Sequence, residues 1–178
     1  MGAKDGSTCE FLGFKLDLET RSLKDALNPQ AIVRFTVWHN QLLSTLLSHY
    51  AQANPVPLTG NLVKFKDLPG GYAYEGAFNK RAINPISDFF GEKPEPLRQA
   101  GKLLGGSELS FGDVSVQITA LKSIPLTYIL WSANEFAASA NILYDSSACN
   151  YLPTEDLAVL GELTTGRLIE AKKCCLKE

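Results

Sequence analysis

The alternation of hydrophobic and polar residues predicts β-strands at several places along the chain. Residues 11–19 place Leu12, Phe14, Leu16 and Leu18 on one side of an opening strand, and residues 61–68 alternate in the same way. Residues 113–121 and 125–132 are rich in β-branched and aromatic side chains. Only three residues separate these last two stretches, which favours an antiparallel hairpin. Residues 140–145 predict one more short strand.

Helical spacing of hydrophobic residues predicts the helices. Residues 38–53 carry such a pattern after a short extended stretch through Ile32, Val33, Phe35 and Val37, and this helix should end before Pro55. A second helix is expected from Tyr72 to Ala82, with a break and a new turn at Pro85. A third, starting near residue 95, should be closed by Gly105 and Gly106, since glycine readily takes the left-handed conformation that ends helices.

The last helix has the clearest signal in the sequence. Thr154 is predicted to cap it, acidic residues fill its first turn, and it is expected to run to about Lys172. Its hydrophobic stripe consists of Leu157, Leu160, Leu163, Leu168 and Ile169.

Strands paired in hairpins, with the helices collected elsewhere, predict an α+β fold. We expect a single domain over residues 1–178: a mainly antiparallel sheet with helices packed on it and an amphipathic helix at its C-terminus. The core should span about residues 11–172, and residues 1–8 and 173–178 should form loose termini.

Composition and charge narrow the classes of function. The chain has 178 residues, 45% of them hydrophobic and 20% charged, which is typical of globular proteins. Its net charge of −2 gives no reason to expect a nucleic-acid partner. The longest apolar stretch, residues 124–131, is far shorter than a membrane span, and the N-terminus lacks an export signal. We therefore expect a cytoplasmic protein without a membrane partner.

The cysteines and histidines do not form a recognisable metal motif. Cys9, Cys149, Cys174 and Cys175 lack the CxxC spacing of zinc or iron–sulfur sites. The Cys174–Cys175 pair is either a frayed, reduced tail or a soft-metal ligand. His39 and His49 would lie about 15 Å apart along a helix, too far to share an ion. His49 alone is either a hydrogen-bonded structural residue or a single axial ligand to a tetrapyrrole or corrinoid.

The stretch LPGGYAYEGAFNKRA, residues 68–82, is the first candidate binding site. Pro69 and Gly70 suit the two central positions of a type II turn. Alternatively, Gly71 and the amides after it begin a helix that is open to an anionic ligand. Four side chains would then surround that ligand: Tyr72, Tyr74, Lys80 and Arg81. No nucleotide-binding glycine motif is present.

The stretch YDSSACNYLPTED, residues 144–156, is the second candidate. Its small polar residues serve turns and caps, or they include a nucleophile in Ser147 or Cys149. Glu155 and Asp156 are either an acid–base pair or acids placed favourably at a helix N-terminus. The serine hydrolase motif GxSxG is absent.

Three separated blocks, residues 58–91, 124–148 and 151–163, together resemble a bacterial family, largely from anaerobes, that is known as domain of unknown function 3786. Some of its members are labelled putative iron–sulfur proteins, but the four-cysteine cassette that this label implies is missing here. The resemblance provides no catalytic residues to transfer. The matching positions are Pro69, Gly70, Gly71, Tyr74, Phe78, Arg81, Pro125, Trp131, Asp145, Leu152, Pro153, Glu155 and Asp156.

Three hypotheses remain open. The favoured one is a ligand- or cofactor-binding accessory domain of anaerobic redox or C1 metabolism, with no catalytic residue, metal or cofactor assigned. Its candidate ligand-binding residues are Gly70, Gly71, Tyr72, Tyr74, Lys80, Arg81, Asp145 and Glu155. The second is an enzyme acting on a small anionic substrate, in which Arg81 or Lys80 binds charge and Asp145 or Glu155 is the base. The third is a protein–protein interaction domain. We expect Arg81 to neighbour an acid of residues 145–156.

Overall fold

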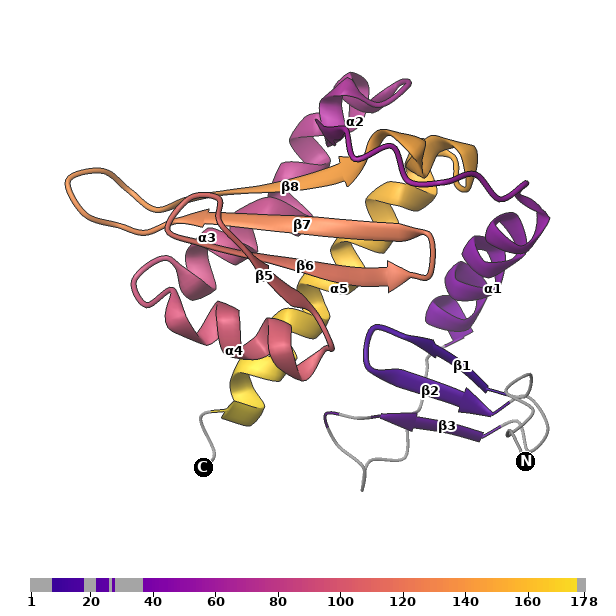
Figure 1. Cartoon of the computed structure of the whole chain (residues 1–178), viewed down its shortest axis with the longest axis horizontal. Helices are drawn as coiled ribbons and strands as arrows, with labels where there is room; N and C mark the ends of the chain where they lie inside the picture. Colours follow the sequence, from indigo (N-terminus) through magenta and orange to yellow (C-terminus); the bar gives the residue numbers. More distant parts are fainter. Residues whose placement is uncertain (1–7, 18–21, 26, 28–36, 176–178) are drawn as a thin grey trace.

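The computed structural model describes residues 8–17, 22–25, 27 and 37–175, which form an α+β fold. Its main sheet has five antiparallel strands in the order β4-β8-β7-β6-β5, and helices α2 to α5 cover one face of it (Figure 1). A separate sheet has three strands in the order β1-β2-β3. The predicted fold class is therefore confirmed.

The main sheet is built around one long hairpin. Strands β6 (Val114–Leu121) and β7 (Ile124–Trp131) pair as predicted, and β8 (Ser139–Asp145) pairs with β7 from Leu126 to Trp131. The two edge strands are short: β4 (Leu62–Lys64) and β5 (Ser107–Leu109). β5 was not predicted, because three residues are too few to show a pattern.

The strand predicted over residues 61–68 is shorter in the structure. β4 ends at Lys64, and a 3-10 turn, Phe65–Asp67, follows it. Phe65 is buried, and its ring stacks on that of Phe78 with 4.1 Å between centroids. Burial of this ring in the core draws the chain away from the sheet edge.

One continuous helical segment follows. It consists of α2 (Gly71–Phe78), a π-helical turn (Asn79–Ile83) and α3 (Asn84–Phe90). The predicted break at Pro85 is wrong. In the π turn, Asn84 donates its N–H to the carbonyl of Asn79, and this wider turn accommodates a proline that would clash with a regular α-helical turn.

Two further helices end close to their predicted positions. α4 (Glu95–Leu103) is followed by Gly105 with a φ of 72°, the left-handed conformation that was expected there. α1 (Val37–Gln52) ends before Pro55 as predicted. Val37, expected in an extended stretch, is instead the first residue of α1, and the remainder of that stretch lies outside the described residues.

The C-terminal helix α5 (Thr154–Cys175) extends three residues beyond the predicted end, so Cys174 and Cys175 belong to a helix rather than to a frayed tail. Thr154 is not its cap. Leu157 donates its N–H to the carbonyl of Pro153, and the Thr154 hydroxyl donates to the carbonyl of Pro69 at 2.7 Å. Thr154 therefore joins the start of α5 to the LPGG turn.

The opening strand predicted over residues 11–19 is a hairpin instead. β1 (Thr8–Phe11) and β2 (Phe14–Asp17) are joined by Leu12 and Gly13, both with positive φ, and β3 (Ser22–Asp25) pairs with β2. Positive φ at both positions is what a two-residue hairpin turn needs, and glycine takes it without strain.

The core lies between the main sheet and its helices, and two buried tyrosines cross it. Tyr128 donates its hydroxyl to the carbonyl of Gly161 at 3.2 Å, and Tyr144 donates to that of Leu157 at 2.8 Å. A Cβ on Gly161 would lie 2.6 Å from the Tyr144 oxygen, so glycine permits this close packing. Among the described helices, none is both long and apolar enough to cross a membrane.

Candidate functional site

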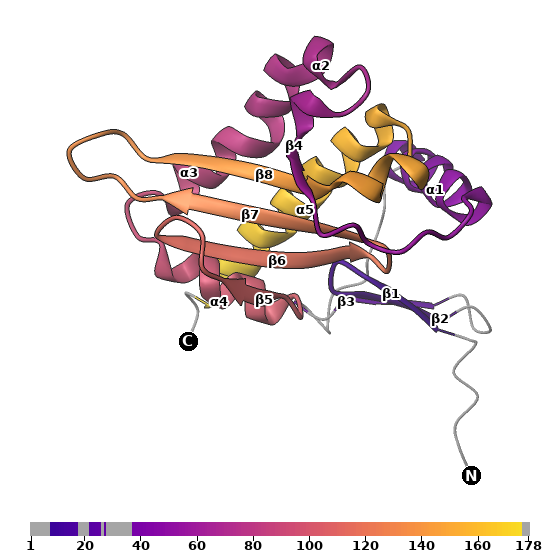
Figure 2. The same cartoon turned by 45° about the horizontal axis from the view of Figure 1, so that its top comes forward.

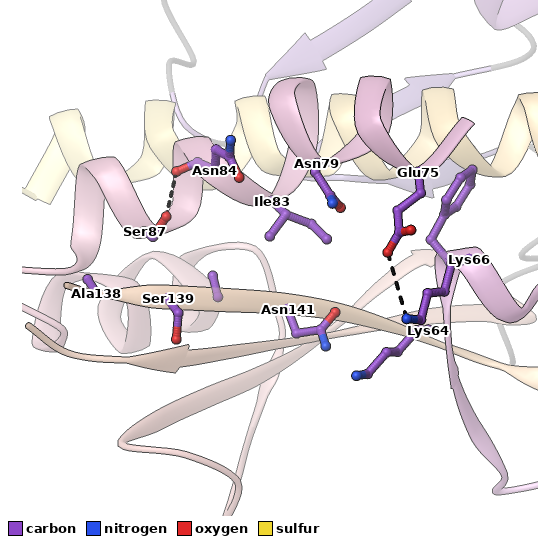
Figure 3. Close-up of a pocket in the computed structure, with 12 residues that line it drawn as sticks. Lys64, Lys66, Glu75, Asn79, Ile83, Asn84, Ser87, Ala138, Ser139 and Asn141 are labelled. Carbon is purple, nitrogen blue, oxygen red and sulfur yellow. Dashed lines mark hydrogen bonds and ion pairs between the residues drawn. The ribbon is translucent and has the colours of Figure 1, made fainter. Parts of the chain in front are cut away.

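A polar groove lies between the α2–α3 segment and β8. It has a volume of about 320 Å³. In Figure 3 the helical segment forms one wall and β8 the other, and Lys64 and Lys66 stand at one end. Besides these lysines, the polar side chains of the lining are Glu75, Asn79, Asn84, Ser87, Ser139 and Asn141. This volume falls at the lower end of the range for ligand pockets.

The π turn orients the helical wall. Glu75, Asn79, Ile83 and Ser87 follow one another at intervals of four and all line the groove. In a regular α-helix such a row drifts around the axis by about 40° at each step, because the turn holds 3.6 residues. The wider turn at residues 79–83 reduces this drift, and in Figure 3 Glu75, Asn79 and Ile83 all point toward β8.

Positive charge exceeds negative charge in the groove. The Lys66 ammonium lies 4.0 Å from the Glu75 carboxylate, and both side chains are partly exposed, so their attraction is weak. Lys64 has no carboxylate partner among the described residues and stands at the same end of the groove (Figure 3). An anion bound at this end would meet two ammonium groups opposed by one carboxylate.

Amide and hydroxyl groups supply the remaining polar contacts. The Asn141 side-chain oxygen accepts the N–H of Ile142 at 2.9 Å, and the Ser87 hydroxyl donates to the carbonyl of Asn84 at 2.9 Å. The Asn79 side chain makes no hydrogen bond within the described residues and points into the groove (Figure 3). The groove can therefore both donate and accept hydrogen bonds.

None of the eight predicted ligand-binding residues lines this groove. The LPGG stretch is the predicted type II turn: Gly71 donates its N–H to the carbonyl of Leu68 at 2.8 Å, and Gly70 has a φ of 76° and a ψ of −3°. A Cβ on Gly71 would lie 2.0 Å from the carbonyl oxygen of Phe65. Glycine at position 71 is thus explained by backbone packing.

The predicted side chains after the turn lie on another side of the same helical segment. Tyr72, Tyr74 and Lys80 are exposed. Arg81 is exposed as well, and its Nε lies 3.6 Å from a carboxylate oxygen of Glu162. The acidic partner of Arg81 therefore comes from the middle of α5 and not from residues 145–156, where it was expected.

Asp145 organises the loop at the end of β8. Its carboxylate accepts hydrogen bonds from the backbone of Thr59, Gly60 and Ser147, and from the Thr59 and Ser147 hydroxyls. Burial acts to raise its pKa, but the hydrogen bonds from Ser147 and Thr59 outweigh burial and hold the pKa well below its usual range. Such a carboxylate is poorly suited to be a general base near neutral pH.

The surroundings of the loop's two nucleophile candidates do not favour nucleophilic attack. The Ser147 hydroxyl donates to Asp145 at 2.6 Å, and this carboxylate is a weak base because its pKa is lowered. Cys149 is a free thiol whose pKa is raised by burial, and this disfavours the reactive thiolate.

The two neighbouring acids of α5 differ in their roles. Nδ1 of His49 lies 2.5 Å from a carboxylate oxygen of Asp156, so this pair joins α1 to the first turn of α5, and Glu155 is exposed. His49 is thus a hydrogen-bonded residue, one of the two alternatives left open by the sequence. No group of three metal-ligating side chains occurs in the part of the chain that the structure describes.

A second hollow, of about 480 Å³, lies at the end of the sheet where β7 passes into β8. Trp131 and Phe136 line it, and both are exposed, Phe136 to 80%. Exposed aromatic side chains of this kind are what the hypothesis of a protein–protein interaction domain would require.

Comparison with known protein families shows to which family the chain belongs. The family described as domain of unknown function DUF3786 matches residues 8–167. The chain belongs to this family. Comparisons with curated proteins and with solved structures give no match. The family match thus covers β1 to most of α5, including all residues of the polar groove.

The sequence patterns did not indicate the groove residues, although the predicted site lies on the helical segment that also forms one wall of the groove. The row at 75, 79, 83 and 87 could have been found by following intervals of four through Pro85. Asn141 and Lys64 carried no comparable signal, because they join the site only through strand pairing.

Proposed function

We propose that this DUF3786 domain is a non-catalytic ligand-binding domain and that an anionic ligand binds in the polar groove between α2–α3 and β8. The observation that carries the proposal is the excess of ammonium groups at one end of a groove that is otherwise lined by amides and hydroxyls. Ammonium groups attract an anion, and amide groups fix its orientation through directional hydrogen bonds.

The enzyme hypothesis receives less support. It needs a base, and one of its two candidates, Asp145, is a weak base because its hydrogen bonds lower its pKa. The groove contains one carboxylate, that of Glu75, which is opposed by Lys66. A binding role requires only the charges and hydrogen-bonding groups present.

A role in anaerobic redox or C1 metabolism rests on the family resemblance, and a cytoplasmic location rests on the sequence. Both stay predictions. So does ligand binding by the exposed face of residues 70–81 together with Asp145 and Glu155.

The proposal can be tested by two-dimensional amide NMR, with succinate and inorganic phosphate as probes. Shifts should gather at Lys64, Asn79 and Asn141, and Lys64→Met should weaken binding about tenfold. Lys80→Met is the matched control, since it also removes one positive charge, at an exposed position outside the groove. Native mass spectrometry of protein purified from an anoxic host tests for a ligand acquired in the cell.

Equal weakening by Lys64→Met and Lys80→Met would show a general charge effect and contradict the proposal. Shifts gathered at Tyr72, Arg81 and Glu155 instead would transfer the site to the residues predicted from the sequence.

A further inference from the structure

The strand that forms one wall of the groove has an edge that is only half covered. β8 pairs with β7 from Ser139 to Tyr144, but on its other side β4 covers only Leu143 to Asp145. Figure 2 shows β4 beside one end of β8. Residues 139–142 therefore have no strand neighbour on the groove side in the described part of the chain, and this open edge is about 13 Å long at 3.3 Å per residue.

The ladder pattern determines which backbone groups face the groove. The carbonyl of Leu130, the residue opposite Ala140, accepts the N–H of Asp113 on the β6 side, so the backbone groups of Leu130 point away from β8. In an antiparallel pair the partner of such a residue also points outward. The N–H and C=O of Ala140 therefore face the groove, and so do those of Ile142, two residues further along.

The contacts on both sides agree with this assignment. Ser146, on the same outward-facing set, donates its N–H to the carbonyl of Asn61 beside β4. The N–H of Ile142 is bonded by the side chain of Asn141 rather than by a strand. Ala140 has no such bond among the described residues. The groove thus presents the N–H and carbonyl of Ala140, which are groups that an added strand would use.

We infer that the ligand of the groove is the extended C-terminal end of another polypeptide, which adds beside residues 139–142 of β8 with its terminal carboxylate between Lys64 and Lys66. The inference rests on the proposed function and names its ligand class. Backbone pairing would supply affinity, and the lysines would recognise the charge of the chain end.

The ends of the groove favour a chain terminus over a loop. At the lysine end β4 already occupies the edge from Leu143 onward, so an added strand must stop there. At the other end the helix packs against the β7–β8 loop: a Cβ on Gly91 would lie 2.3 Å from the Cβ of Ala138, and Gly91 accepts the N–H of Ala133 at 3.0 Å. A segment of three or four residues fits, running parallel to β8 so that its carboxylate meets the ammonium groups.

The test uses a display library of random heptapeptides with free C-termini, selected against the wild-type chain. Ala140→Pro removes the outward N–H and places a ring in the groove without removing a hydrogen bond to β7, as proline does on an edge strand. Ala140→Ser keeps the N–H and is the matched control. Peptides should be enriched, bind Ala140→Pro at least about tenfold more weakly, and bind Ala140→Ser about as well as wild type.

Two further measurements complete the test. Amidation of the selected peptides should weaken binding about as much as Lys64→Met does, and the amide of Ala140 should exchange more slowly with solvent when peptide is bound. Thermal unfolding of each variant checks that a loss of binding is not a loss of folding.

The outcomes separate this inference from the proposed function. If no peptide is enriched, the inference is overturned. It is also overturned if the selected peptides bind Ala140→Pro as well as they bind the wild-type protein, or if their amidated forms bind as well as the free acids. If succinate or phosphate then still binds in a Lys64-dependent manner, the proposed function stands without it. If neither peptides nor anions bind at the groove, both are wrong.

Discussion

The guanidinium of Arg167 in α5 lies 2.5 Å from the carboxylate of Asp25 at the end of β3. The same guanidinium donates to the carbonyl of Leu12 at 2.9 Å and lies over the ring of Phe14, 4.0 Å from its centroid. Arg167 is only 8% exposed, so these contacts form a buried connection between the three-stranded sheet and the helix that supports the main sheet.

Arg167→Met should therefore destabilise the protein by about 3–5 kcal/mol, because it removes the guanidinium that pairs with the largely buried carboxylate of Asp25. Urea unfolding measures the change in free energy. Glu170→Gln is the matched control: Glu170 also pairs with Arg167 but is 58% exposed, and its loss should cost about 0–1 kcal/mol. Equal effects of the two substitutions would show that the Arg167–Asp25 pair is not a structural connection.

Gly71→Ala should destabilise the protein by about 1–3 kcal/mol, since a methyl group at this position collides with the backbone of Phe65. Gly76→Ala, in the same helix, meets nothing within 4 Å and should stabilise by about 0.5–1 kcal/mol through helix propensity. Thermal and urea unfolding of both variants measure these changes. A stable Gly71→Ala variant would contradict the packing explanation for this glycine.

Stability should fall with acidification in a way that depends on Asp145. Its folded-state pKa is held below the unfolded value of about 3.9, so its stabilising contribution is complete above that value and is lost as the pH falls toward the folded-state pKa. Asp145→Asn should cost about 1–3 kcal/mol near neutral pH and make the decline below about pH 4 less steep. Unfolding curves from pH 7 to pH 3 test this, and identical slopes in both proteins would refute it.

Thr154→Val should cost about 1 kcal/mol, because it removes the hydroxyl that donates to Pro69 and keeps a similar volume. Thr154→Ser keeps the hydroxyl and should restore most of the loss. Amide NMR should show changed shifts in residues 68–71 for the valine variant only. A helix-cap role would instead change shifts mainly in the first turn of α5.

Local rules explain the elements that the sequence predicted well. Pro69 and Gly70 form the expected type II turn because proline fixes one dihedral angle and glycine freely takes the next. Gly105 ends α4 for a similar reason. The β6–β7 hairpin and the stripe of α5 follow from side-chain periodicity, which depends only on neighbours in the chain.

The wrong predictions lie where contacts beyond the local sequence pattern determine the backbone structure. The helix continues through Pro85 because a π turn accommodates the ring, and Phe65 leaves the sheet because its ring packs on Phe78. Thr154 has the sequence signal of a helix cap, yet its hydroxyl donates a hydrogen bond to the carbonyl of Pro69. Over residues 11–19 the alternation of hydrophobic and polar residues predicted one strand, although Gly13 was a local signal for the hairpin turn that the structure has at Leu12 and Gly13.

The order of neighbouring residues was thus enough to predict the α+β class, the central hairpin, the terminal helix and the turn before α2. The polar groove, in contrast, exists only because distant segments pack together. Lys64, Asn79 and Asn141 come from two strands and a helix, and their proximity follows from the pairing of β4 with β8 and from the packing of α2–α3 against that strand. Side-chain periodicity shows which face of an element is buried, but not which element will lie opposite it.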